Sequence, residues 1–334
     1  MDKNRLGKSD LRVSKVGLGA LHFGAYLSEY QSMELISYAL DSGINLIDVG
    51  PLYGNGLAEA IVGKSLLGRR DKILLTTKVG LLRRKLNDGS FGVDVLSLTS
   101  KNITESLERS LKQLRTDYVD LFQLHAYDSS TPLEISLGVL NKLVIEGKIR
   151  AIGISNFSPE QLTEAVEIIK LNNWSPISSI ETHFNMIERM AVKKLGPLCM
   201  ENCIGMLPYR SLARGILSDK YKIGLPLPEN SRAVDSWRVR DWLTHDTLSL
   251  VDALSKYSAG KNISITQLSI AWLLAHQFIP TVLIGARTTL QLQQNIESIG
   301  RKLTNEEILE IDQIIISMNQ FDKVHSLPPV YFES

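Results

Sequence analysis

Four side chains able to take part in proton transfer, Asp48, Tyr53, Lys78 and His125, stand at or just after the ends of short apolar runs. The run 45–49 carries Asp48 and leads into a turn rich in proline and glycine that contains Tyr53. Lys78 closes the run 73–78, and His125 closes the run 118–125. Such runs are typical of buried parallel strands, whose carboxyl ends surround one pocket. The sequence therefore predicts that these four side chains share one rim.

This combination suits the protonation of a carbonyl oxygen. A phenol with an ordinary pKa of ~10 is a poor proton donor and acceptor near neutral pH unless a cation stabilises its phenolate. Lys78 would be that cation for Tyr53, and Asp48 would hold Lys78 in place. His125 would hydrogen-bond the substrate oxygen or relay its proton. For any one of these residues an ion pair or a helix cap is the commoner role, but four at successive strand ends favour a catalytic site.

Strand-like runs alternate with helical periodicity along the chain. The expected strands are 16–19, 45–49, 73–78, 118–125, 151–155, 178–183, 204–209 and 281–284. The expected helices are 31–42, 57–67, 100–114, 137–146, 159–171, 189–200 and 290–299, and a long loop, 210–244, delays the helix after the seventh strand. Residues 5–16 predict a hairpin at the bottom of the fold, a polar insert is expected at 83–94, and helices 265–277 and 305–318 are expected outside the ring. The tail 327–332 is expected to fold over the pocket.

Eight strand-and-helix units without a change in composition predict an α/β fold, a single (β/α)8 TIM barrel domain spanning residues 1–334. The alternative is an open doubly wound sheet. Gly17-x-Gly19 does not open a helix with a third glycine, so the usual dinucleotide signature of that alternative is absent. A nucleotide would have to be bound in another way.

The composition fits a globular protein of the cytoplasm. Of 334 residues, 44% are hydrophobic and 22% charged, and the net charge of +1 gives no electrostatic reason to expect nucleic acid or an anionic membrane as partner. The amino terminus has no apolar signal segment, and no apolar run approaches the roughly 20 residues that cross a bilayer. Cys199 and Cys203 stand on an expected helix without nearby histidine or aspartate partners, which favours reduced thiols over a metal site.

The four residues and their contexts resemble the catalytic tetrad of the aldo-keto reductase superfamily. The matching contexts are Asp48-x-x-x-x-Tyr53-Gly54, Thr77-Lys78 and Asp120-Leu121-x-x-x-His125. Further similar segments extend over nearly the whole chain: residues 153–157, 209–215, 231–233 and 284–287, the last of which leads to Gln291 and Asn295. The long insert after the seventh strand and residues 231–233 resemble bacterial members and the branch that contains the potassium-channel beta subunits.

Two strand ends carry residues suited to a nicotinamide. Ser155 and Asn156 could hydrogen-bond its carboxamide and Tyr209 could stack on its ring, although helix capping and apolar packing are common for such residues. The resemblance implies the functional roles for all three. It also places Glu181 where the family usually has glutamine. A carboxylate accepts hydrogen bonds but donates none unless protonated, so the carboxamide contact there would be altered.

The resemblance implies further cofactor contacts in three segments. The loop after the seventh strand would fold over the pyrophosphate, although a basic loop is more often simply solvated. The last strand and helix would bind the adenosine half, with Gln294 in place of the more frequent glutamate. The residues so implied, besides Asp48, are Gly19, Ala20 and Leu21; Arg210, Ser211, Leu212, Ala213, Arg214, Lys220 and Arg232; and Gly285, Arg287, Gln291, Gln294 and Asn295.

The expected cofactor is NADP(H), with NAD(H) left open. Arg232 and Arg287 could both approach a ribose 2′-phosphate, and the guanidinium fork suits a phosphate well. The leading interpretation is an NAD(P)H-dependent enzyme that reduces a small aldehyde or ketone, or catalyses the reverse oxidation, with Tyr53 as general acid and base. One alternative is a regulatory or scaffolding subunit that binds cofactor with little turnover. Another is a barrel hydrolase or isomerase without nicotinamide. The oligomeric state is left open.

The substrate is predicted only as a class. The context from Asp48 to Gly56 resembles branches that act on sugars, which favours a sugar or sugar-derived carbonyl. His22, Tyr53 and His125 are the expected substrate contacts, and polar donors on the loops are His22, Arg83, Tyr127 and Asp128, although polar loop residues are mostly solvated. Trp237 and Trp242 would wall an apolar aldehyde site or anchor their loop.

Overall fold

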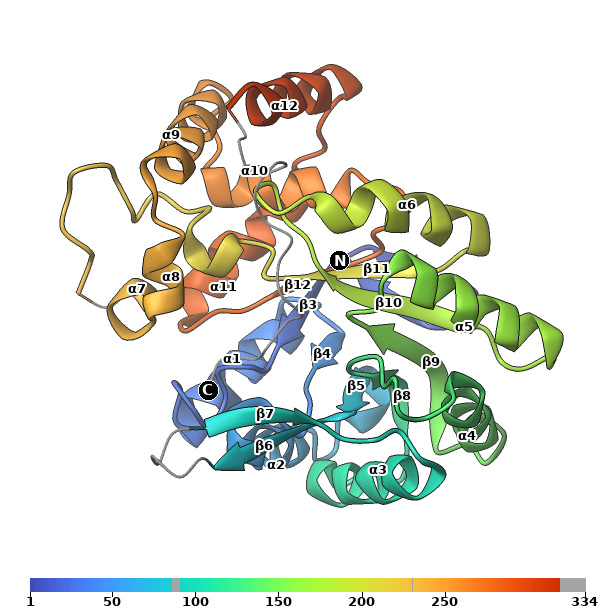
Figure 1. Cartoon of the computed structure of the whole chain (residues 1–334). Coiled ribbons are helices and arrows are strands. Elements are labelled where there is room, and N and C mark those ends of the chain that lie inside the picture. Colours follow the sequence, from blue (N-terminus) through green and yellow to red (C-terminus); the bar gives the residue numbers. More distant parts are fainter. Residues whose placement is uncertain (86–90, 230, 319–334) are drawn as a thin grey trace.

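Eight parallel strands form the centre of the computed structural model, which describes residues 1–85, 91–229 and 231–318 (Figure 1). Their order is β11-β10-β9-β8-β5-β4-β3-β12, and β11 contacts β12, so the sheet curls into a nearly closed barrel. This order confirms the barrel and excludes the open doubly wound sheet. The strands are β3 (Val16–Gly19), β4 (Leu46–Asp48), β5 (Leu74–Val79), β8 (Val119–Leu124), β9 (Ile149–Ser155), β10 (Ile177–His183), β11 (Gly205–Tyr209) and β12 (Val282–Ile284).

Amphipathic helices surround the barrel and bury one face each. On α3 the buried apolar residues Ile103, Leu107, Leu111 and Leu114 recur at helical spacing. Serine caps with a glutamine three residues later begin α1, α5 and α10, as a capping box predicts. The ring helices are α1 (Glu29–Asp41), α2 (Leu57–Ser65), α3 (Ser100–Leu114), α4 (Leu133–Ile145), α5 (Pro159–Leu171), α6 (Met190–Asn202), α10 (Ile265–Leu274) and α11 (Thr289–Glu297).

The expected amino-terminal hairpin is confirmed. β1 (Lys3–Arg5) pairs with β2 (Arg12–Ser14) in antiparallel fashion. Its apolar residues Leu6, Leu11 and Val13 are buried against side chains from five barrel strands, among them Leu46 and Leu121. The hairpin therefore fills the end of the barrel opposite the carboxyl ends of the strands, where the catalytic residues are expected.

The structure differs from the expected elements in the insertions. The expected polar insert forms an antiparallel hairpin, β6 (Leu81–Lys85) and β7 (Phe91–Val95), with the ion pair Arg84–Asp94 across it. The long loop contains the short elements η3 (Ala213–Gly215), α7 (Arg232–Asp235) and α8 (Trp237–Asp241), and α9 (His245–Gly260) follows it. The tail 327–332 lies outside the described residues.

The placement of the helix 265–277 outside the ring was wrong. α10 packs against β12, and six of its apolar side chains are buried, including Trp272. The helix outside it is α9, which contacts α10 and α12 (Asn305–Met318). α4 also begins earlier than expected, at Leu133, because Pro132 stands at its amino-terminal cap. Within the described residues, no helix is long and apolar enough to cross a membrane.

Candidate functional site

Adjacent strands bring Asp48 and Lys78 together. In the parallel pairing of β4 with β5, Asp48 lies opposite Thr76. Lys78 lies two residues after Thr76, toward the carboxyl end of β5. The Nζ of Lys78 lies 2.5 Å from Oδ1 of Asp48, and that oxygen also accepts a 2.5 Å hydrogen bond from Thr76 Oγ1. Both charged side chains are buried, which strengthens their attraction. The pair forms the floor of the site.

Tyr53 reaches this pair from a tight turn. It begins the 3₁₀ element η1 (Tyr53–Gly56), and Gly54 has φ +55, where a Cβ would lie 1.9 Å from the carbonyl oxygen of Phe23. Glycine is therefore required there. The Tyr53 hydroxyl lies 3.0 Å from Lys78 Nζ and 3.4 Å from Asp48 Oδ2. The structure thus brings three of the four expected catalytic side chains into one hydrogen-bonded group.

The charges of this group act on the phenol in opposite directions. Burial raises the pKa of Tyr53 well above its ordinary value, the Lys78 ammonium lowers it, and the Asp48 and Glu181 carboxylates raise it again. Burial would lower the pKa of Lys78, but Asp48 and Glu181 hold it well above its ordinary value. Lys78 is therefore cationic and Tyr53 is protonated, which is the state that a proton donor needs.

His125 is the first residue after β8, and its ring stands edge-on to Tyr53. The ring centroids are 6.2 Å apart, with an interplanar angle of 73°. The backbone amide of His125 donates to Val79 O at 2.7 Å, which fixes the residue beside Lys78. Burial and the charge of Lys78 hold the pKa of His125 well below its ordinary value. The imidazole is therefore neutral and suits hydrogen bonding to a substrate oxygen.

Ser155, Asn156 and Tyr209 also meet. The Tyr209 hydroxyl donates to Asn156 Oδ1 at 2.7 Å, and Asn156 Nδ2 donates to His125 O and to Ser155 Oγ, each at 3.0 Å. Asn156 has φ 60, a left-handed conformation that asparagine tolerates better than most residues. One face of the Tyr209 ring stacks on His183, with centroids 5.4 Å apart at 17°.

Glu181, on β10, faces the group of Asp48, Tyr53 and Lys78 across the barrel. Its Oε2 lies 3.3 Å from Lys78 Nζ and accepts a 2.8 Å hydrogen bond from Gln123 Nε2. Burial and the Asp48 carboxylate raise the pKa of Glu181 to about 7, although Lys78 and Gln123 favour its ionised form. The sequence predicted only an altered carboxamide contact here. The structure adds a second carboxylate on Lys78.

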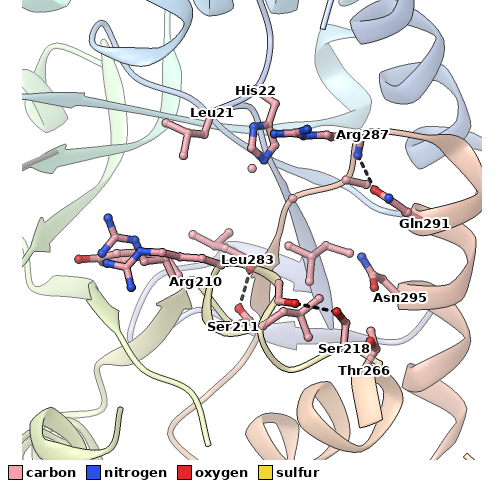
Figure 2. A pocket seen from close by; sticks show the side chains of 18 of the residues that line it. Leu21, His22, Arg210, Ser211, Ser218, Thr266, Leu283, Arg287, Gln291 and Asn295 are labelled. Carbon is pink, nitrogen blue, oxygen red and sulfur yellow. Dashed lines mark hydrogen bonds between the residues drawn. The ribbon is translucent and has the colours of Figure 1, made fainter. Parts of the chain in front are cut away.

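A cavity of about 680 Å³ runs from this group toward α11. That volume lies within the range of small-molecule and cofactor sites. Figure 2 shows residues that line it, with Ser211 donating to Leu283 O at 2.6 Å across the seam between β11 and β12. The expected residues that line it are Gly19, Leu21, His22, Asp48, Tyr53, Glu181, Tyr209, Arg210, Ser211, Leu212, Arg214, Lys220, Arg232, Gly285, Arg287, Gln291, Gln294 and Asn295.

Six expected residues lie outside this lining. Ala20 and Ala213 are buried in the core around the loops that carry them. Lys78 and His125 contact the lining residue Tyr53, and Asn156 is hydrogen-bonded to Tyr209 and to Ser155.

A cluster of basic side chains stands at one end of the cavity. His22 lies beside Arg287 in Figure 2, and the guanidinium of Arg287 stands 4.9 Å from the ring centroid of Tyr26. Burial, followed by the charges of Arg232 and Arg287, lowers the pKa of His22 to about 3. Arg287 Nη2 and His22 Nδ1 are buried and have no hydrogen-bond partner among the described residues. A cationic pocket with unsatisfied donors fits the phosphates of a dinucleotide.

The cavity also has lining residues that the sequence analysis missed: Gly215, Ser218, Asp219, Ser264, Thr266, Gln267, Leu283, Ile284, Ala286 and Glu297. Ser264 and Gln267 form the capping box of α10. That motif is readable in the sequence and would have placed a helix amino terminus here. The contact of Thr266 Oγ1 with Leu217 O, at 3.4 Å, depends on tertiary packing and has no sequence signal.

Several expected loop contacts have other roles. The Asp128 carboxylate accepts hydrogen bonds from the amides of Leu98, at 2.7 Å, and Ser130, at 2.8 Å, so it stabilises a turn. Tyr127 directs its hydroxyl to Glu164 at 3.4 Å. Trp237 is 59% exposed, whereas Trp242 packs on the core beneath Arg214. Cys199 is buried and Cys203 exposed, and the described residues contain no metal-binding cluster.

Comparisons with known proteins place the chain among the aldo/keto reductases. The profile of the aldo/keto reductase family matches residues 15–316. The chain is 33% identical to the aldo-keto reductase YhdN of Bacillus subtilis, over 94% of each chain. It is 32% identical to a probable voltage-gated potassium channel subunit beta of Arabidopsis thaliana, over 95% of this chain and 97% of that one.

A solved structure shows the same fold. The glycerol dehydrogenase AKR11B4 of Gluconobacter oxydans superposes with a TM-score of 0.83 at 29% identity, over 99% of both chains. The resemblance to bacterial reductases and to the channel beta subunits is thereby confirmed. Because the family profile covers most of a barrel that has the family's fold, the chain belongs to the aldo/keto reductase family.

Proposed function

We propose that the protein is an NAD(P)H-dependent oxidoreductase that interconverts a small aldehyde or ketone and its alcohol, with Tyr53 as the general acid and base. The observation that carries this proposal is the 3.0 Å contact between the Tyr53 hydroxyl and Lys78 at the base of the cavity. Family membership supports carbonyl reduction with a nicotinamide cofactor.

Each residue has a distinct part in this proposal. A bound nicotinamide would supply the hydride for reduction or accept it in the reverse reaction. Tyr53 gives its hydroxyl proton to the carbonyl oxygen, and the Lys78 ammonium stabilises the phenolate that remains. The neutral imidazole of His125 orients the same oxygen. The Tyr209 ring, which stacks on His183, lines the cavity and would contact the nicotinamide ring there.

The preference for NADP(H) is part of the proposal. His22, Arg232 and Arg287 gather at one end of the cavity, and Arg287 Nη2 is buried there without a hydrogen-bond partner among the described residues. The 2′-phosphate of NADP(H) adds negative charge, which the two arginines attract. The contacts of His22 place it with this cluster, so we assign it to the cofactor phosphates in preference to the substrate.

Absorbance of the reduced cofactor tests the proposal directly. The purified protein is mixed with NADPH or NADH and a panel of aldehydes and ketones, and the loss of absorbance is followed. We expect turnover with at least one carbonyl and faster turnover with NADPH. A protein that neither binds a nicotinamide cofactor nor oxidises it with any carbonyl would contradict the proposal.

For the substrate we propose a hydroxylated carbonyl compound of the sugar or polyol type. The support is the similarity to a protein named glycerol dehydrogenase, together with the carboxylates of Asp48 and Glu181, which line the cavity along with Tyr53. A side-by-side kinetic panel should give a higher kcat/KM for hydroxylated carbonyls than for plain aliphatic or aromatic aldehydes. The opposite ranking would overturn the substrate class and leave the reductase in place.

A regulatory subunit that binds cofactor with little turnover is the second candidate. The similarity to a probable potassium channel subunit beta favours it. It predicts tight cofactor binding in titrations without oxidation of NADPH by any carbonyl of the panel. The buried Lys78 and Tyr53 favour the enzyme over this candidate.

A further inference from the structure

Two carboxylates share one ammonium at the base of the cavity. Lys78 Nζ lies 2.5 Å from Asp48 Oδ1 and 3.3 Å from Glu181 Oε2, and all three side chains are buried. Gln123, the other polar contact of Glu181, is neutral. With both carboxylates ionised, the cluster carries one positive and two negative charges. Its net charge is therefore negative.

The other titratable and charged groups around Glu181 do not cancel this charge. Tyr53 and Tyr209 are protonated, because burial raises the pKa of each above its ordinary range. His125 is neutral. The cation of Arg210 stands 5.7 Å from the ring centroid of Tyr209, at the end of β11. It acts equally on any variant of Glu181 and does not alter a comparison between them.

We propose that Glu181 makes the site discriminate between the two redox states of the cofactor, by favouring the oxidised nicotinamide over the reduced one. The proposal rests on the proposed function. Glu181, Tyr53 and Tyr209 all line the cavity at its Asp48 end, where the nicotinamide would lie. The oxidised ring carries a positive charge and the reduced ring carries none, so a net negative cluster attracts only the oxidised ring.

Replacing Glu181 by glutamine would remove the preference for the oxidised nicotinamide without disturbing the packing. A glutamine oxygen would still accept from Lys78 and from Gln123. Gln123, which already contacts Glu181, has a buried Oε1 without a hydrogen-bond partner among the described residues, and this oxygen offers an acceptor for the new amide. Glu181→Gln therefore leaves the site satisfied and changes chiefly its charge.

The charge of Glu181 also changes with pH near neutrality. Burial raises the pKa of its carboxyl to about 7, so the side chain is neutral below that pH and anionic above it. The preference for oxidised cofactor should accordingly be strong in mildly alkaline buffer and weak in mildly acidic buffer. The phosphates of the cofactor titrate in both redox forms, so their contribution cancels in the ratio of affinities.

The test measures dissociation constants for NADP⁺ and NADPH by titration calorimetry on the full chain, at about pH 6 and about pH 8. At the higher pH we expect Glu181→Gln to shift the ratio of the two constants about tenfold toward NADPH. At the lower pH the shift should shrink toward zero. Glu181→Asp, which keeps the charge, should retain most of the preference.

Glu59→Gln is the matched control. Glu59, on α2, is another buried carboxylate, and it accepts a 2.6 Å hydrogen bond from Thr77 Oγ1. It does not line the cavity. The charge of Lys78 acts on Glu59 only weakly, so this variant should shift the ratio far less than Glu181→Gln does.

Three outcomes would overturn the inference. If Glu181→Gln binds both forms with the wild-type ratio at both pH values, Glu181 has no role in redox discrimination, while the proposed function stands. If that variant does not fold, the wild type alone provides the test. A wild-type ratio of the dissociation constants for NADP⁺ and NADPH that stays constant between the two pH values contradicts the inference. If the wild type binds neither form, the proposed function fails together with the inference.

Discussion

The Tyr53 hydroxyl lies 3.0 Å from the Lys78 ammonium, although the two residues come from different units of the barrel. Tyr53 stands on η1 after β4, and Lys78 stands on β5. The cation therefore reaches the phenol only because neighbouring strands pair in register. This relationship underlies the first prediction.

Tyr53→Phe should remove the proton donor and leave the cavity nearly unchanged. General acid catalysis is typically worth about 10²–10⁴-fold, so we expect kcat to fall by about that factor. The affinity for NADPH should stay close to that of the wild type. Steady-state kinetics and a fluorescence titration measure the two quantities. Wild-type reduction rates in the variant would show that another group protonates the substrate.

Glu181→Gln should change the pH dependence of thermal stability. In the folded protein the pKa of Glu181 is raised from 4.5 to about 7, so ionising it disfavours the folded state. The wild type should lose stability as the pH rises through that window, and the loss should be complete above about 7. The variant should therefore have a higher Tm than the wild type at alkaline pH, and the gap should close near pH 4.5. A gap that is constant across the window would show that Glu181 does not titrate in it.

Arg287→Ala should weaken NADPH binding more than NADH binding. Arg287 Nη2 is buried and has no hydrogen-bond partner among the described residues, so it is available to a 2′-phosphate that NADH lacks. We expect the affinity for NADPH to fall by about tenfold or more, as for the loss of one charge-assisted hydrogen bond. Arg301→Ala is a control, since Arg301 pairs with Glu307 and does not line the cavity. Equal losses for both cofactors would assign Arg287 to adenine stacking or to structure.

Asn156→Ala and Asn156→Gly separate the backbone role of this residue from its side-chain role. Both variants remove the hydrogen bonds to His125 O and Tyr209, so both should lower kcat. Only the alanine variant also strains the left-handed backbone at φ 60, which glycine adopts freely. The alanine variant should therefore have the lower Tm. Equal Tm values would mean that the backbone conformation contributes little.

Much of the fold could be predicted from the sequence because each unit carries its own signals. α3 was predicted at its observed bounds: Thr99 caps its start, and Arg115 ends it in a left-handed conformation. The place of α10 is not predictable from the sequence, because two helices, α9 and α10, follow β11 and periodicity alone does not show which of them packs on the barrel. Short helices such as α7 and α8, which lie within the long loop, have too few residues to carry a clear periodic signal.

The site was predictable where a residue stands at a strand end, and less so where the barrel brings distant strands together. The strand ends placed Asp48, Lys78 and His125 near one another, as observed. Glu181 lies on β10, and in the sheet order β8 and β9 stand between it and the strand of Lys78. Its contact with Lys78 crosses the inside of the curled sheet, so no local pattern indicates it. The position of His22 beside the basic cluster likewise depends on the pairing of β3, near the start of the chain, with β12, near its end.

Asp120→Ala should destabilise the barrel without affecting cofactor binding. Asp120 is buried near the start of β8, where it accepts hydrogen bonds from the Leu75 amide at 2.8 Å and from Arg150 Nη1 at 2.7 Å, and it pairs with Arg70 at 2.9 Å. Its removal leaves two guanidinium groups without this carboxylate and one buried amide without an acceptor. We expect a loss of about 2 kcal/mol in the free energy of unfolding.

Asp10→Ala is the matched control, since Asp10 pairs with the same Arg150 at 2.9 Å but its side chain is 75% exposed. An exposed pair of this kind contributes about 0.5 kcal/mol or less. Urea denaturation gives both free energies, and an NADPH titration gives the affinity of each variant. Because Asp120 lies at the end of the barrel away from the cavity, both variants should bind NADPH as the wild type does. If Asp120→Ala were no less stable than Asp10→Ala, the buried network would not hold this end of the barrel together.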